Sequence, residues 1–142
     1  MLVNERFDIA LLSEASGIHS TTGGLSGKLI GEFAPRLIKG KSVHSFDEAI
    51  KAEKDGFDYI MFGPVYRTPA KVKYGSPQGI KKLEEVCNKI NIPVFAVGGI
   101  DPKRAGECIK AGAYGVAVIR ELMQTVNIKK TVNEFREVLG SL

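Results

Sequence analysis

The fold class of this 142-residue chain can be read from KGKSVHSFDEAIKAEKDGFDYIMF, residues 39–62. A predicted strand at residues 39–43 leads into a segment of helical period at residues 46–55, and an apolar run follows at residues 58–62. Gly56 stands between helix and strand, where a left-handed residue ends many helices. Two strands joined by one helix in this way predict a parallel βαβ unit.

The same alternation recurs along the whole chain, and the sequence predicts about six βα units. The other predicted strands are residues 1–4, 17–19, 93–97 and 115–119, and the other predicted helices are residues 6–15, 25–34, 78–90, 102–111 and 131–139. Gly17 and Gly112 repeat the glycine junction of Gly56. We therefore predict one domain, residues 1–142, that is an incomplete (β/α)8 TIM-type barrel, because a full barrel has eight units.

An incomplete barrel leaves unpaired backbone groups on its first and last strands and apolar side chains inside. We expect another chain to cover them, through homo-oligomerisation or swapping, unless the chain is a fragment of a longer protein. A smaller doubly wound sheet is the alternative fold.

The composition excludes several classes of protein. The formal net charge is +4, but the lysines neighbour acids, as in EAIKAEKD, residues 48–55, so we predict solvated helix faces and no nucleic-acid partner. The apolar runs fall short of the roughly 18 residues of a membrane helix, and the start MLVNER turns charged at Glu5, which predicts a cytoplasmic protein without a membrane partner. Cys87 and Cys108 lack the spacing of a zinc or disulfide framework.

Unusual residues gather where the predicted strands end, which is where parallel barrels build their sites. In GGIDPKRAGE, residues 98–107, Asp101 can cap a helix and Gly98 and Gly99 let a ligand approach the backbone. A short helix predicted directly after Ile119 would bring a second helix start beside them. This combination predicts a phosphate site, with a plain strand-to-helix turn as the alternative.

His44 lies between a strand end and a helix start. The Ser45 hydroxyl is predicted to accept from the amide of Glu48, whose carboxylate returns to the amide of Ser45, as in a capping box. The positive helix end favours a neutral imidazole, which could move a proton. The alternative is a turn histidine bonded to backbone, and His19 is interpreted as a residue that lines the site.

The loop at residues 63–77 is longer than most connections between a strand and a helix, and it carries Arg67, Lys71 and Lys73. It is either a cationic flap over an anionic substrate or a solvated surface loop.

The motifs resemble the thiamine phosphate synthase/TenI superfamily over nearly the whole chain. The matching pieces are VNERFDIAL, SGIH, GKSVHSFDEA, KAEKDGFDYIMFGPVYRTPAK, IPVFAVGGIDP and AGAYGVAVI. The resemblance implies a (β/α)8 barrel with two further units before Met1. It also implies a phosphorylated thiazole ligand held by Gly98, Gly99 and the amides after Ile119.

Two branches of this superfamily differ in chemistry. The synthase branch joins a pyrimidine pyrophosphate to the thiazole with magnesium held by two aspartates, and the resemblance places Glu5 and Ser16 at those positions. Because a hydroxyl is a poor substitute for a carboxylate on a hard cation, these departures favour the TenI branch. In that branch the SVHS segment, residues 42–45, carries a histidine that shuttles a proton. Arg120 replaces a small residue.

We therefore expect a metal-independent thiazole tautomerase, an isomerase, with His44 as acid and base and no cofactor. The alternatives are a magnesium-dependent thiamine-phosphate synthase, a transferase that would use Glu5, and a non-catalytic phosphate-binding or regulatory protein. The residues expected to bind the phosphorylated thiazole are Ser42, Thr68, Lys71, Gly98, Gly99, Ile119 and Arg120.

Overall fold

Strands and helices alternate through the residues that the computed structural model describes, 1–68 and 76–140. The strands are β1 (Leu2–Asn4), β2 (Gly17–Ser20), β3 (Ile38–Val43), β4 (Tyr59–Phe62), β5 (Val94–Val97) and β6 (Gly115–Ala117). The helices are α1 (Phe7–Leu12), α2 (Gly27–Phe33), α3 (Phe46–Lys54), α4 (Gly79–Lys89), α5 (Pro102–Lys110), α6 (Arg120–Gln124) and α7 (Ile128–Gly140).

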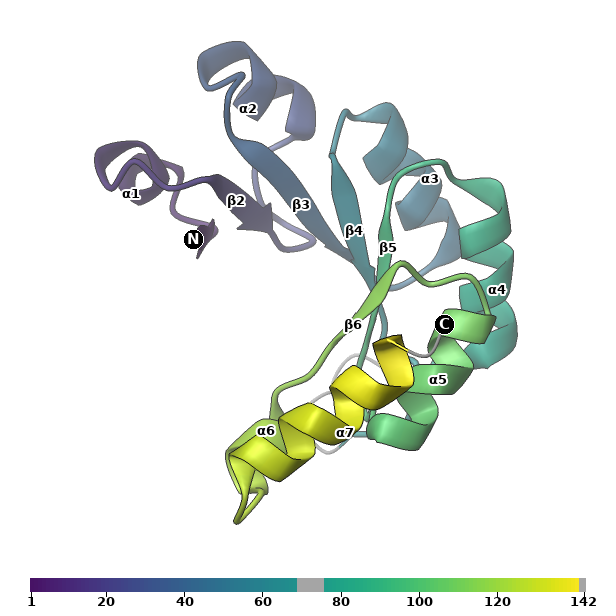
Figure 1. Ribbon diagram of the computed structural model, residues 1–142. Coiled ribbons are helices and arrows are strands. Elements are labelled where there is room, and N and C mark those ends of the chain that lie inside the picture. Colours follow the sequence, from purple (N-terminus) through teal and green to yellow (C-terminus); the bar gives the residue numbers. More distant parts are fainter. Residues whose placement is uncertain (69–75, 141–142) are drawn as a thin grey trace.

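The strands form one parallel sheet whose spatial order follows the chain, β1-β2-β3-β4-β5-β6. Figure 1 shows the sheet curled, with helices α2 to α5 on its outer side. A doubly wound sheet would reverse its strand order at a switch point, so that alternative is wrong. The prediction of an incomplete barrel is confirmed, because six parallel strands make a curled half-barrel.

Two of the three predicted glycine junctions are confirmed. Gly56 (φ 83°) and Gly112 (φ 92°) adopt the left-handed conformation after α3 and α5. The prediction for Gly17 is wrong, because Gly17 begins β2 and the left-handed residue after α1 is Glu14 (φ 50°). A Cβ on Gly17 would collide with the carbonyl oxygen of Ile38, so this glycine instead lets β2 and β3 approach each other.

The hydrophobic core lies between the outer face of the sheet and the helices. Ile18, Val43 and Ile60 point outward from their strands and are fully buried. Ala49 and Ala52 on α3 are small enough to let that helix pack closely on the sheet. Each large buried aliphatic side chain contributes roughly 1.5–3 kcal/mol relative to an exposed one, so this layer holds the half-barrel together.

The inner face of the sheet carries a row of rings. The ring centroids of His19 and Tyr59 lie 5.7 Å apart, those of Tyr59 and Phe95 5.6 Å, and those of Phe95 and Tyr114 5.4 Å. Gly40 leaves the space that the Tyr59 ring occupies, since a Cβ there would overlap that ring. Tyr114 is 73% exposed, so the row ends in solvent in this open sheet.

Apolar side chains are exposed beside both sheet edges. Leu2 and Leu12 are 44% and 83% exposed near β1, and Ile119 and Met123 are 76% and 79% exposed after β6. Their exposure agrees with the expectation that an open barrel needs a cover, and the oligomeric state stays a prediction. None of the described helices is both long enough and apolar enough to cross a membrane.

Candidate functional site

A cavity of about 120 Å³ lies at the carboxyl ends of β5 and β6. Among the described residues, its lining includes Thr68 and residues 97–100 and 117–121. Five of the residues predicted to bind a phosphate therefore share one cavity, namely Thr68, Gly98, Gly99, Ile119 and Arg120. Lys71 lies outside the described residues, as do Lys73 and the rest of the segment 69–75 of the predicted cationic flap.

The glycine turn packs against the protein's own loop after β4. Gly98 (φ 101°) and Gly99 (φ 65°) are both left-handed, and a Cβ on Gly98 would lie 2.7 Å from the Cα of Pro64. The amide of Tyr66 donates to the carbonyl of Gly98 at 3.0 Å. The turn thus needs glycines for its conformation and for this close packing as well as for any ligand.

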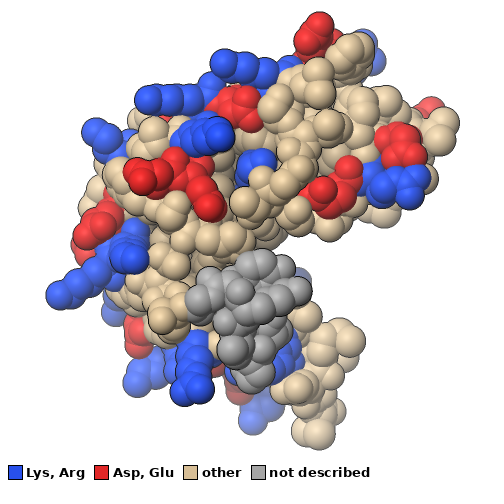
Figure 2. All heavy atoms as spheres, turned by 180° about the vertical axis from the view of Figure 1, so that it is seen from behind, with Lys and Arg blue, Asp and Glu red and all other residues tan. Residues whose placement is uncertain are grey.

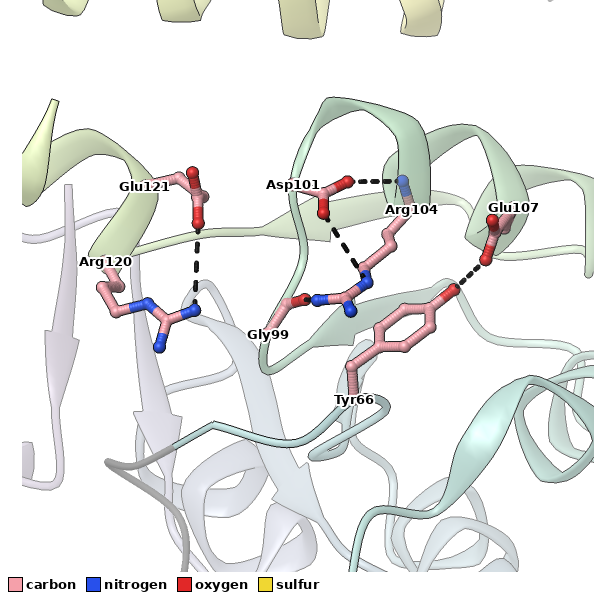
Figure 3. A network of polar contacts seen from close by, with 7 residues as sticks. All are labelled: Tyr66, Gly99, Asp101, Arg104, Glu107, Arg120 and Glu121. Carbon is pink, nitrogen blue, oxygen red and sulfur yellow. Dashed lines mark hydrogen bonds and ion pairs between the residues drawn. The ribbon is translucent and has the colours of Figure 1, made fainter.

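Arg104 fixes the turn from the other side, a feature that sequence reasoning missed (Figure 3). Its Nη1 donates to the carbonyl of Gly99 at 2.8 Å, and its guanidinium carbon lies 4.7 Å from the centroid of the Tyr66 ring. The Tyr66 hydroxyl donates to Glu107 at 2.6 Å. Burial, and then this hydrogen bond, raise the pKa of Tyr66, so the phenol stays protonated.

The start of α5 is already capped by the protein. As predicted, the Asp101 carboxylate accepts from the amide of Arg104 at 2.8 Å, and Pro102 occupies the first helical turn. This amide therefore faces a side chain rather than a ligand. The cap thus removes one of the amide donors that the start of α5 could offer to a phosphate.

The α6 side of the cavity carries opposite charges. Arg120 is the first residue of α6, and its Nη2 lies 3.9 Å from Oε1 of Glu121 (Figure 3). The helix is only five residues long, so its dipole contributes little. Charge in this wall therefore comes mainly from the two side chains.

Comparison with known proteins decides what this fold and cavity belong to. The profile of the thiamine monophosphate synthase family matches residues 1–122. The chain belongs to this family. It is similar to putative thiamine-phosphate synthase 2 of Aquifex aeolicus, with 41% identity over 124 residues, which are 87% of this chain and 66% of that protein.

Two further comparisons agree. The thiamine-phosphate synthase of Methanocella arvoryzae is 37% identical over 140 residues, covering 98% of this chain and 66% of the relative. The solved structure of a thiamine phosphate pyrophosphorylase from Pyrococcus furiosus superposes with a TM-score of 0.89 at 34% identity, covering 99% of this chain and 67% of that one. The chain thus spans just under two thirds of the length of these curated relatives.

The expected isomerase is wrong. The relatives from this family are named thiamine-phosphate synthase, which is a transferase, and their identity to the chain extends over nearly all of it. The departures at Glu5 and Ser16 therefore do not place the chain in the TenI branch.

The magnesium positions assigned to Glu5 and Ser16 do not form a site. Ser16 lies before β2, where its hydroxyl accepts from the amino terminus of Met1 at 3.2 Å, whereas Glu5 follows β1 at the opposite end of the strand pair. The Glu5 carboxylate accepts from the amide of Thr21, and a Cβ on Gly24 would lie 2.9 Å from its Oε1. Ser16 and Glu5 therefore cannot hold one ion together, and the described residues contain no group of three or more His, Cys, Asp or Glu side chains that could hold a metal.

His44 is held by backbone at the start of α3. Its Nδ1 lies 2.5 Å from the carbonyl oxygen of Gly63, which can only accept, so Nδ1 carries the proton. Ser45 caps α3 as predicted, by accepting from the amide of Glu48 at 3.2 Å. The Glu48 carboxylate returns to the amide of His44 at 2.7 Å rather than to that of Ser45, which corrects the capping box. The described lining of the cavity does not include His44.

Ser42 lies apart from the cavity. Its hydroxyl is 2.9 Å from Nε2 of His19, whose Nδ1 is 3.0 Å from the Tyr59 hydroxyl. This chain of polar groups crosses β2, β3 and β4 on the inner face of the sheet. Sequence reasoning placed His19 at the site but could not find its two partners, because they come from other strands.

Figure 2 shows acidic and basic side chains interspersed over one face of the molecule.

Proposed function

We propose that this chain acts in thiamine-phosphate synthesis and binds the phosphorylated thiazole that is joined to a pyrimidine. The observation that supports the proposal most directly is the cavity at the ends of β5 and β6, in a chain of the thiamine monophosphate synthase family. Family membership supports the reaction class. The position of the cavity supports the site, because parallel barrels bind ligands at the carboxyl ends of their strands.

The cavity offers three kinds of group to a phosphate. Gly98 and Gly99 present backbone without side chains, Thr68 presents a hydroxyl, and Arg120 presents a guanidinium. Backbone amides and hydroxyls can donate to phosphate oxygens, and a guanidinium adds a charge-assisted pair of hydrogen bonds. Val97, Ile100 and Val118 add apolar residues to the lining.

In this proposal His44 positions the site and does not transfer a proton to substrate. Its ring holds the carbonyl of Gly63, and a Cβ on Gly63 would collide with the carbonyl of Val97, so the two loops are in contact. The imidazole thereby helps to fix the loop on which the glycine turn rests.

Titration calorimetry tests the binding step. The purified chain is titrated with the thiazole phosphate and, as a matched control, with the same thiazole alcohol without its phosphate. We expect the phosphate ester to bind at least about 10-fold more tightly than the alcohol, because only the ester meets the charged groups of the cavity. Equal affinities, or no binding of the ester, would refute the proposed site.

A turnover assay tests the reaction. The chain is incubated with the thiazole phosphate and a pyrimidine pyrophosphate, with and without magnesium, and pyrophosphate release is measured against a reaction that lacks the thiazole. Thiazole-dependent release would support the complete synthase reaction. Binding without release would limit the function to thiazole binding.

A further inference from the structure

The two arginines beside the glycine turn have different surroundings. The guanidinium of Arg104 is fixed, since it donates to the Gly99 carbonyl at 2.8 Å, lies over the Tyr66 ring and pairs with Asp101 at 3.6 Å. Arg120 is among the residues that line the cavity, and its guanidinium forms an ion pair with Glu121 at 3.9 Å. Arg104 is thus held more firmly than Arg120, whose ion pair is longer.

The ion pair of Arg120 is a weak restraint. Neighbouring residues on a helix do not face each other, and 3.9 Å is the outer limit of such a pair. The two side chains are 41% and 35% exposed, so water screens their attraction. An anion that enters the cavity can therefore displace Glu121 at little cost.

Arg120 is also the single cation among the described residues that line the cavity. Its counter-charge, Glu121, lies in the same wall and leaves the pocket nearly neutral when no ligand is bound. A neutral ligand gains nothing from this pair, whereas a phosphate dianion attracts the guanidinium and repels the carboxylate.

We propose that Arg120 is the residue that makes this cavity selective for phosphorylated ligands, by exchanging Glu121 for the ligand's phosphate. The inference rests on the proposed function and assigns the role of this side chain within it. The planar guanidinium can donate two parallel hydrogen bonds to phosphate oxygens. Glu121 competes for the guanidinium and so weakens phosphate binding.

Three variants separate charge from shape. Arg120→Met removes the charge and keeps an unbranched side chain that reaches about as far as the arginine Nε. Arg120→Lys keeps the charge without the planar fork, and Glu121→Gln removes the competing anion. Arg36→Met is the matched control, because Arg36 is exposed after α2 and distant in sequence from the cavity, and it changes the net charge equally. Melting temperatures within about 2 °C of the original chain establish that each variant folds.

The affinities for the thiazole phosphate and for the thiazole alcohol are the decisive measurement. We expect Arg120→Met to lower the affinity for the ester by about 10- to 100-fold and to leave the affinity for the alcohol nearly unchanged. Arg120→Lys should have an intermediate effect on the affinity for the ester. Glu121→Gln should raise the affinity for the ester by a few-fold, and Arg36→Met should change the affinity for neither ligand. An equal effect of Arg120→Met on both ligands, or no effect on the ester, overturns the inference.

Inorganic phosphate separates this inference from the proposed function. Its stabilisation of the folded chain is measured by thermal unfolding against chloride at equal ionic strength. If the original chain fails to bind the thiazole phosphate, the proposed function fails. In that case the inference about Arg120 is still supported if inorganic phosphate stabilises the original chain but not Arg120→Met. The inference is overturned if phosphate stabilises both chains equally.

Discussion

The guanidinium of Arg104 donates a hydrogen bond to the carbonyl oxygen of Gly99 at 2.8 Å. Arg104 stands in the first turn of α5, five residues after the glycine whose conformation it fixes. The contact orients the left-handed turn that forms one wall of the cavity. A side chain of helix α5 therefore supports the conformation of the site.

Replacing Arg104 should loosen this turn. We expect Arg104→Ala to lower the free energy of unfolding by about 1–2 kcal/mol, because a charge-assisted hydrogen bond and a cation–π contact are lost at a partly exposed position. Urea unfolding measures the change. Arg36→Ala is the control and should stay within about 0.5 kcal/mol of the original chain. Equal values for the two variants would show that the contact contributes nothing.

Glycine is required at position 98 for two reasons, positive φ and the nearby Pro64. Gly98→Ala should therefore cost about 2 kcal/mol or more of unfolding free energy. Gly31→Ala is a matched control with the opposite sign, because Gly31 lies inside α2 with no described atom within 4 Å of an added Cβ, and alanine there should stabilise by about 0.5–1 kcal/mol. Chemical denaturation of both variants tests the contrast.

The cap of α3 should have a measurable energy. Ser45→Ala removes the acceptor for the Glu48 amide and should destabilise the fold by about 1 kcal/mol. Ser13→Ala serves as control, since the Ser13 hydroxyl only donates to the carbonyl of Ile9 at an exposed position. If the two substitutions cost the same, the capping interpretation is wrong.

Glu5 should make stability depend on pH in the acid range. Hydrogen bonds from Thr21, first of all from its amide, hold the pKa of Glu5 below its ordinary value of 4.5. Because the pKa of Glu5 is lower in the folded state than in the unfolded state, its ionised carboxylate stabilises the fold at pH values above the ordinary pKa. This stabilisation is lost as the pH falls through the folded-state pKa. Glu5→Gln should be less stable than the original chain near pH 6, and the two should converge on acidification.

The measurement is urea unfolding at several pH values between about 3 and 6, which bracket the ordinary carboxylate range. Glu14→Gln is the control, because Glu14 also has a positive φ (50°) and is exposed. A pH profile of Glu5→Gln parallel to that of the original chain would contradict the prediction.

The exposed apolar residues beside the sheet edges predict self-association. We expect a solution mass above the 15.4 kDa of one chain in sedimentation or light scattering. Met123→Glu, at 79% exposure, should shift the equilibrium toward the monomer, and the matched exposed control Lys129→Glu should not. A monodisperse monomer would show that these edges are stable uncovered.

Much of the fold could be predicted from local patterns. The alternation of apolar runs and helical segments predicts β1 to β6 and their parallel order, because each βαβ unit is specified within about 30 residues. The caps at Ser45 and Asp101 are local for the same reason, since donor and acceptor are three residues apart. The ends of α1 and β6 were predicted less well, because packing rather than periodicity ends them.

The sequence by itself determined the alternation of strands and helices, the glycine turn at the end of β5 and the polar residues at strand ends, whereas the strand order of the structure decided between a half-barrel and a doubly wound sheet. Only the tertiary structure decided which residues meet: it paired Ser42 with His19, Arg104 with Gly99 and His44 with Gly63, and it separated Ser16 from Glu5. The physical reason is that these contacts join different elements, so they depend on strand register and helix packing, which no short segment specifies.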